Sequence, residues 1–136
     1  MRVFLDTNVL VSAFASRGLC AEVLELVLLD HDLILGRNVL RELDKAMRQK
    51  VKLPAVRSPE IVDFVSSEAT QVVDKAEAAN VSVDAADARV LGEALAGAAA
   101  TFVTGDTALL RIAAVGALRI VSPRQFWEIL RVGSEL

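Results

Sequence analysis

Short apolar runs alternate with amphipathic stretches along the whole chain, and this alternation limits the possible folds more than any other feature. Runs with the length of buried strands occupy 3–5, 32–35, 101–104 and 119–121, with a minor one at 70–73. Segments with helical periodicity occupy 9–15, 20–29, 38–49, 60–69, 85–98, 107–113 and 123–130, and 54–59 is expected to be a loop. Strands that alternate with helices form mostly parallel sheets. The sequence therefore predicts an α/β protein, a three-layer α/β/α sandwich around a mostly parallel central sheet.

The composition fits such a sandwich and bounds the class of protein. The 136 residues are expected to form one domain, 1–136, and 54% of them are hydrophobic while only 4% are aromatic. The longest apolar run, 94–103, is too short to cross a bilayer, which takes about 20 residues. Met1 leads into the first strand without a charged leader, and the single Cys20, expected in the core, cannot form an internal disulfide. We therefore expect a cytoplasmic protein that does not bind a membrane.

Two carboxylates follow strands of the predicted sheet. Asp6 comes directly after the apolar run 3–5, and Asp106 follows the run 101–104 through a single Gly105. In open α/β sheets, ligands bind beyond the carboxyl ends of the strands. Both side chains are therefore expected at the edge where a site would form, although Asp106 also suits the N-cap of the next helix.

Two further carboxylates belong to helices that would pack over the same edge. Asp87 begins the apolar stripe of its helix, and Glu42 lies on the shoulder of the apolar face of 38–49. Each has a structural alternative. Asp84 and Asp87 resemble a capping box, and Glu42 could pair with an Arg or Lys one turn away. Taken singly these positions favour the structural alternative, but together with the two strand-end acids they favour a shared site.

Four carboxylates in one place indicate a divalent cation. Like charges raise some of their pKa values unless a cation neutralises them, and oxygen-only ligands suit Mg²⁺ or Mn²⁺. Such an ion lowers the pKa of a bound water and stabilises charge on a phosphate, which is the chemistry of phosphodiester hydrolysis.

Other chemistries lack their residues in this chain. There is no Gly-rich phosphate loop and no Cys/His zinc spacing. The one histidine, His31, is expected in a surface turn rather than beside a nucleophile. An aspartyl-phosphate enzyme would carry a second Asp two residues after Asp6, where this chain has Asn8.

Charge is distributed unevenly, although the net charge is only −3. Basic residues gather between 37 and 57, and acidic residues gather between 60 and 93. One row of the 38–49 helix and its flanks carries the basic side chains Arg37, Arg41, Lys45, Arg48 and Lys52. This row could bind a phosphate backbone, and a solvated helix face explains it equally well when it is taken alone.

Four segments, in order along the chain, resemble the motifs of the PIN domain family, and specifically of its small VapC-like toxin ribonucleases. They are LDTNVL at 5–10, NVLREL at 38–43, Asp87 with its apolar stripe, and VTGD at 103–106 followed by Leu109 and Leu110. Two positions depart from the family pattern. Gly36 and Arg37 precede the second-acid helix, where relatives more often have a Ser or Thr cap. The third acid is either Asp84 or Asp87, and the register of the helix favours Asp87.

The resemblance implies a Rossmann-like fold, Mg²⁺ or Mn²⁺ as cofactor, and RNA as substrate. It implies that the metal ligands and catalytic residues are Asp6, Glu42, Asp87 and Asp106. Asn8 and Thr104 would support the first and last acids through hydrogen bonds, with Asp84 as an outer supporting residue. The side chains that would hold the RNA backbone are Arg37, Arg41, Lys45 and Arg48. Many members are toxins neutralised by an antitoxin whose C-terminal segment lies across the active site, and members are often homodimers.

These observations leave functions of different classes open. The first is a metal-dependent endoribonuclease that hydrolyses single-stranded RNA as the toxin of a toxin–antitoxin pair. The alternative is a catalytically inactive PIN-like module that binds RNA or docks onto a protein. Degenerate members of the family usually lose some of the acids, and this chain has all four. An α/β-type phosphatase acting on small phosphomonoesters is a weaker third hypothesis.

Overall fold

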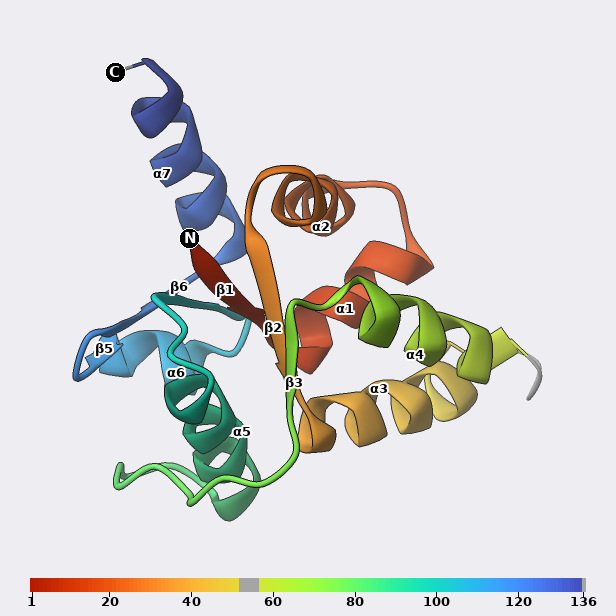
Figure 1. Ribbon diagram of the computed structural model, residues 1–136, viewed down its shortest axis with the longest axis horizontal. Coiled ribbons are helices and arrows are strands. Elements are labelled where there is room, and N and C mark those ends of the chain that lie inside the picture. Colours follow the sequence, from red (N-terminus) through yellow and green to blue (C-terminus); the bar gives the residue numbers. More distant parts are fainter. Residues whose placement is uncertain (52–56, 136) are drawn as a thin grey trace.

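Six strands form one sheet across residues 1–51 and 57–135, the part of the chain that the computed structural model describes (Figure 1). They are β1 (Arg2–Leu5), β2 (Asp32–Gly36), β3 (Gln71–Val73), β4 (Thr101–Val103), β5 (Ala114–Val115) and β6 (Leu118–Val121). The order across the sheet is β3-β2-β1-β4-β6-β5, and every neighbouring pair is parallel except β5 with β6. The prediction of an α/β protein with a mostly parallel sheet is confirmed.

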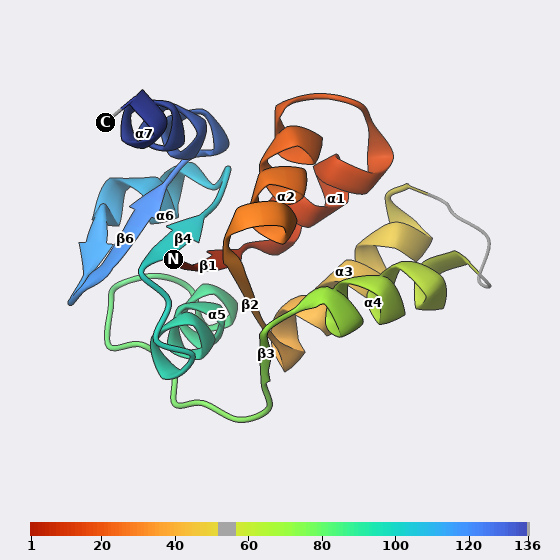
Figure 2. The ribbon, with the colours of Figure 1, turned by 45° about the horizontal axis from the view of Figure 1, so that its top comes forward.

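The same described residues form seven helices around this sheet. They are α1 (Thr7–Ala15), α2 (Leu19–Asp30), α3 (Arg37–Gln49), α4 (Arg57–Glu68), α5 (Ala85–Ala96), α6 (Thr107–Ile112) and α7 (Pro123–Glu135). α5 lies on one face of the sheet, and α1, α2 and α7 lie on the other (Figure 2). The chain steps outward from β1 to β3 and then returns to β4 beyond β1, so right-handed crossovers put α5 opposite α1. None of these described helices is both long and apolar enough to span a bilayer.

The core explains why the strands lack an alternating pattern. Val3, Phe4 and Leu5 of β1 are all fully buried, because helices cover both faces of the sheet. Phe4 and Phe102 are paired in register on β1 and β4, and their rings stack with centroids 5.3 Å apart. β1 and β4 are therefore joined by the packing of these two rings as well as by backbone hydrogen bonds.

Several element boundaries differ from the sequence-based expectation. α4 begins at Arg57, so 57–59 is helical rather than part of the predicted loop. Pro59 lies in the first turn of the helix, where a proline is compatible with helical structure. The rest of the predicted loop, 54–56, lies outside the described residues. The two-residue β5 was not predicted, and it turns back onto β6 at Gly116, which has a φ of 59°. α5 ends at Ala96 rather than at 98, where the backbone reaches a φ of 54°, and α7 extends beyond 130.

Two side chains also differ from expectation. Cys20, predicted in the core, is half-buried at its edge. His31, predicted in a surface turn, is the C-cap of α2 and is partly buried, with its ring centroid 6.3 Å from that of Phe126.

The parallel strands place one edge of the sheet where a site can form. The carboxyl ends of β1, β2, β4 and β6 all lie at this edge, and α1 and α3 begin there directly after their strands. α6 begins a few residues after β4. Side chains from distant parts of the sequence therefore meet at this edge.

The stacked pair gives a direct test of the core. Replacing Phe102 by Ala is expected to lower the free energy of unfolding by about 3–5 kcal/mol, because it removes a fully buried ring and leaves a cavity against Phe4. Urea denaturation followed by circular dichroism measures the loss. Phe64→Ala is the matched control: Phe64 is 44% exposed and packs edge-on against Phe14 alone among the described aromatic rings, so the loss should be clearly smaller than that of Phe102→Ala. Equal losses would contradict the placement of Phe102.

Candidate active site

A cavity of about 590 Å³ opens at the carboxyl edge of the sheet. Residues that flank or belong to α1, α3, α5 and α6 line it. The four acids that the sequence singles out are all among its lining residues: Asp6, Glu42, Asp87 and Asp106. Carboxylates up to 100 positions apart in the chain therefore face one space.

Asp6 is held rigidly in this cavity. It is 7% exposed and is the N-cap of α1, with Oδ1 accepting a hydrogen bond from the Thr7 backbone N–H at 2.8 Å. Its Oδ2 accepts from Thr104 Oγ1 at 2.8 Å and from Asn8 Nδ2 at 3.1 Å. Burial raises the pKa of Asp6, and these hydrogen bonds oppose that rise without reversing it.

Thr104 and Asn8 join the ends of β1 and β4. The buried Thr104 hydroxyl oxygen accepts from the Asp106 backbone N–H at 3.0 Å, and Asn8 Oδ1 accepts from the Gly105 N–H at 2.8 Å. Asp106 is the N-cap of α6 and accepts from the Ala108 N–H at 2.8 Å. Both side chains expected to support the acids thus lie where they can orient them, and the capping role of Asp106 coexists with its place in the cavity.

Glu42 is oriented by a residue that the sequence analysis did not single out. Thr7, at the start of α1, donates a hydrogen bond from Oγ1 to Glu42 Oε2 at 2.7 Å. Its position between Asp6 and Asn8 is the only sequence signal that could have identified it. The buried carboxylate of Glu93 on α5 was not singled out either. The sequence signal that could have identified it is Gly36, which stands at the N-cap of α3 without a side chain that could cap the helix.

Asp84 and Asp87 divide the two roles that the sequence left open. Asp84 is exposed and is the N-cap of α5, accepting a hydrogen bond from the Asp87 backbone N–H at 2.8 Å. Asp87 lines the cavity, whereas Asp84 does not. Desolvation raises the pKa of Asp87 to about 6, with further contributions from the negative charges of Asp84, Asp106, Asp6 and Glu42.

The acids supply the donor set that a hard divalent cation prefers, without forming a closed cage. Every charged acceptor at the cavity is a carboxylate, and oxygen ligands suit Mg²⁺ or Mn²⁺. Among residues 1–51 and 57–135, no three His, Cys, Asp or Glu side chains stand close enough together to hold a metal ion. Burial and, after it, the negative charges of the neighbouring carboxylates both raise the pKa of Asp87, so a cation at the cavity would stabilise its charged form. The donor chemistry therefore fits such an ion, and tight coordination would require the side chains to close in.

The basic residues of the predicted row, Arg37, Arg41, Lys45 and Arg48, all belong to α3, but they differ in their partners and in their distance from the acids. Lys45 lines the cavity together with Lys50, which was not singled out, and Arg41 is exposed on α3. Arg37 is paired with Asp74 at 2.6 Å, and Arg48 is paired with Asp44 at 3.0 Å, both on the surface. Lys52 lies outside the described residues. The positive charge that lines the cavity therefore comes from Lys45 of α3 and from Lys50, the residue directly after that helix.

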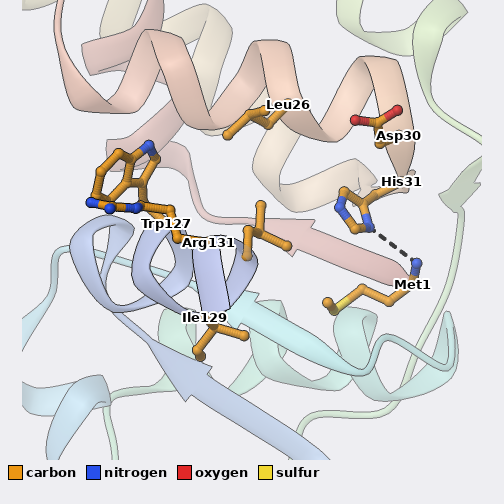
Figure 3. A pocket seen from close by; sticks show the side chains of 8 residues that line it. Met1, Leu26, Asp30, His31, Trp127, Ile129 and Arg131 are labelled. Carbon is orange, nitrogen blue, oxygen red and sulfur yellow. Dashed lines mark hydrogen bonds between the residues drawn. The ribbon is translucent and has the colours of Figure 1, made fainter. Parts of the chain in front are cut away.

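A second cavity, of about 540 Å³, has a different character (Figure 3). It lies between α2 and α7, and its lining includes Leu26, Trp127 and Ile129, with Asp30 as its one acid. Met1 lies at its rim, with its amino nitrogen 3.1 Å from His31 Nδ1 (Figure 3). No predicted site residue lines this cavity, and it lacks a group of acids for phosphate chemistry.

Comparisons with known proteins agree with the fold. A family model described as PIN domain matches residues 2–108. A chain in the crystal structure of VapBC2 from Rickettsia felis, bound to a DNA fragment from their promoter, is similar with a TM-score of 0.65 and 18% sequence identity. The similarity covers 90% of this chain and 98% of that one. No curated protein sequence matches the chain significantly.

The raised pKa of Asp87 predicts a pH dependence of stability in the metal-free protein. Its pKa is 3.8 in an unperturbed chain and about 6 here, so the folded state binds more protons than the unfolded state between these values. The protonated Asp87 side chain therefore contributes to the free energy of unfolding in full below pH 3.8, and this contribution is lost as the pH rises through about 6. Relative to wild type, Asp87→Asn should therefore gain stability between about pH 4 and pH 7. Urea denaturation with a chelator measures this, and parallel pH profiles of the two proteins would contradict it.

Proposed function

Because the chain belongs to the PIN domain family, we propose that it is a metal-dependent endoribonuclease that hydrolyses phosphodiester bonds of single-stranded RNA. One observation carries the proposal: four carboxylates from separate elements line one cavity at the carboxyl edge of the sheet. The raised pKa of Asp87 supports it, because groups with perturbed pKa values in a cavity are typical of functional sites.

The proposed metal ligands are Asp6, Glu42, Asp87 and Asp106. A bound Mg²⁺ or Mn²⁺ would supply an activated water and would stabilise the negative charge that develops on the phosphate. Residues of the chain itself hold the carboxylates of these ligands in place. Thr104 and Asn8 fix the carboxylate of Asp6, and Thr7 fixes that of Glu42, so the acids meet a substrate with little loss of side-chain freedom.

Binding of RNA is proposed to rely on charge rather than on base stacking. Lys45 and Lys50 line the same cavity as the acids, and Arg41 is exposed one turn before Lys45 on α3. Only 4% of the residues are aromatic, which leaves few side chains on which bases could stack. The phosphate backbone would therefore provide most of the affinity, with little readout of sequence.

We further propose that the chain is the toxin of a toxin–antitoxin pair. Its motifs resemble those of VapC-like toxins, and its fold is similar to that of a chain of VapBC2. In such a pair, the antitoxin would block RNA by covering the acidic cavity. Basic antitoxin residues would neutralise the carboxylates that otherwise repel one another.

Removal of one acid should abolish cleavage without unfolding the protein. Asp87→Asn is expected to reduce Mn²⁺-dependent cleavage of a single-stranded RNA by about 100-fold or more, because it removes a charged ligand from the site. The metal-free variant should be as stable as wild type or more stable at pH 7, since it relieves repulsion. Asp6→Asn is a less clean change, because the amide nitrogen that replaces Oδ2 cannot accept the hydrogen bonds that Thr104 and Asn8 donate.

A gel assay with a fluorescent RNA, together with thermal unfolding, measures both quantities. Undiminished cleavage by Asp87→Asn would exclude Asp87 from the site. Wild-type protein that binds RNA but leaves it intact with Mg²⁺ and Mn²⁺ would instead favour the inactive binding module.

Backbone binding predicts a specific salt dependence. In an Asp87→Asn background, where RNA remains intact, Lys45→Ala should weaken binding and reduce the slope of log affinity against log salt by about 0.7. Filter binding between about 50 and 200 mM salt measures this. Arg48→Ala is the control, because Asp44 already pairs with that guanidinium, so the effect should be smaller. A slope that Lys45→Ala leaves unchanged would place the RNA elsewhere.

A further inference from the structure

The helix that carries Glu42 begins without an N-cap side chain of its own. α3 starts at Arg37 after Gly36, and no side-chain hydrogen bond is made by Gly36. The first N–H groups of a helix have no acceptor within it, so an N-cap Ser, Thr, Asp or Asn normally satisfies one of them. An acceptor must therefore come from elsewhere in the fold.

A carboxylate of another helix provides this acceptor. Glu93 of α5 is 2% exposed, and its Oε2 accepts a hydrogen bond from the Asn38 backbone N–H at 2.9 Å and from Asn38 Nδ2 at 3.3 Å. The Asn38 N–H belongs to the second helical residue, one of the groups that an N-cap side chain ordinarily binds. The partial positive charge at the start of α3 also favours a carboxylate there.

Glu93 in its present place leaves room only for a glycine at position 36. A Cβ atom on Gly36 would overlap with the carboxylate carbon and both carboxylate oxygens of Glu93. A Ser or Thr cap at this position cannot coexist with Glu93 in its present place. The glycine at position 36 therefore leaves the space that the Glu93 carboxylate occupies when it caps α3 from α5.

Packing alone does not explain a glutamate at this position. Glu93 Oε1 is buried and makes no hydrogen bond of good geometry within the described part of the chain, although the nearby Val39 backbone N–H also favours the charged carboxylate. An unpaired buried oxygen is costly, and an apolar side chain would avoid that cost. The hydrogen bond to the start of α3 is the interaction that only the carboxylate provides.

We infer that Glu93 is a positioning residue, which caps α3 from α5 and thereby holds Glu42 at a fixed place relative to Asp87. Glu42 lies one turn beyond Asn38 on α3, and Asp87 lies on the same helix as Glu93. Thr7 holds the far end of the Glu42 side chain, so the acid is fixed both through its helix and through its carboxylate. This inference rests on the proposed function, because Glu93 acts through two of the proposed metal ligands.

A cap exchange separates positioning from simple stabilisation. Glu93→Ala removes the cap, and Gly36→Ser alone introduces the overlap, so each variant should unfold at a lower urea concentration than wild type. In the double variant, the serine has room and can cap α3 from within its own chain, so most of the stability should return. The double variant restores the cap without restoring the connection to α5.

The deciding readouts are the position of Glu42 and the affinity for Mn²⁺. Crystal structures of wild type and the double variant should differ by about 1 Å or more in the separation of the Glu42 and Asp87 carboxylates. Calorimetric titration with Mn²⁺ alone should show affinity about tenfold weaker in the double variant, although its stability has recovered. Glu93→Gln, which keeps an acceptor oxygen, should retain affinity within about threefold of wild type.

Ala96→Gly, at an exposed position of α5, is the matched control, since it loosens the helix without touching Glu93 or Gly36. An unchanged carboxylate separation in the double variant would overturn the inference. Recovery of both stability and Mn²⁺ affinity in that variant would also overturn it, because the cap alone would then suffice. If wild type itself fails to bind Mn²⁺, the proposed function fails, and the crystal structures still decide the role of Glu93.

Discussion

The parallel pairing of β1 with β4 is the constraint on which the site depends. Leu5 and Val103 are paired in register, and the Asp6 backbone N–H donates to the Val103 carbonyl at 3.0 Å. The next residues of both strands therefore leave the sheet side by side, and the Thr104 hydroxyl reaches Asp6 across the gap. A slip of one residue would turn Asp6 to the other face and break this contact.

The same arrangement creates an electrostatic cost that the fold does not relieve by itself. Asp6 is buried, Asp87 has a pKa near 6, and the two lysines at the cavity form no ion pair with these acids among the described contacts. Proteins often retain such destabilising groups where function requires them. Capping roles offset part of the cost, because Asp6 and Asp106 each begin a helix while facing the cavity. Structural and chemical explanations of these acids are therefore compatible.

Most of the fold could be predicted, because its signals are local. Buried strands such as 3–5 are continuous apolar runs, and the caps at Asp84 and Asp106 depend on neighbours a few residues away. The two-residue β5 was missed because so short a strand has no pattern of its own and exists through pairing with β6. The exposed pair of Arg37 with Asp74 was missed because its members lie 37 positions apart in the chain, and the pair of Arg48 with Asp44 was missed although its i, i+4 spacing on α3 is a local signal.

The sequence by itself determined the alternating α/β architecture and singled out the four acids that follow strands or lie on helices packed over the strand ends, since periodicity and chain direction specify where such residues come to lie. Only the tertiary structure decided which carboxylates share a cavity, which threonine holds Glu42, and that Glu93 caps a helix to which it does not belong. The physical reason is that the two hydrogen bonds join residues 35 and 55 positions apart, and the acids of the cavity are up to 100 positions apart. Their distances depend on how helices pack on the sheet, and no local pattern of residues encodes that packing.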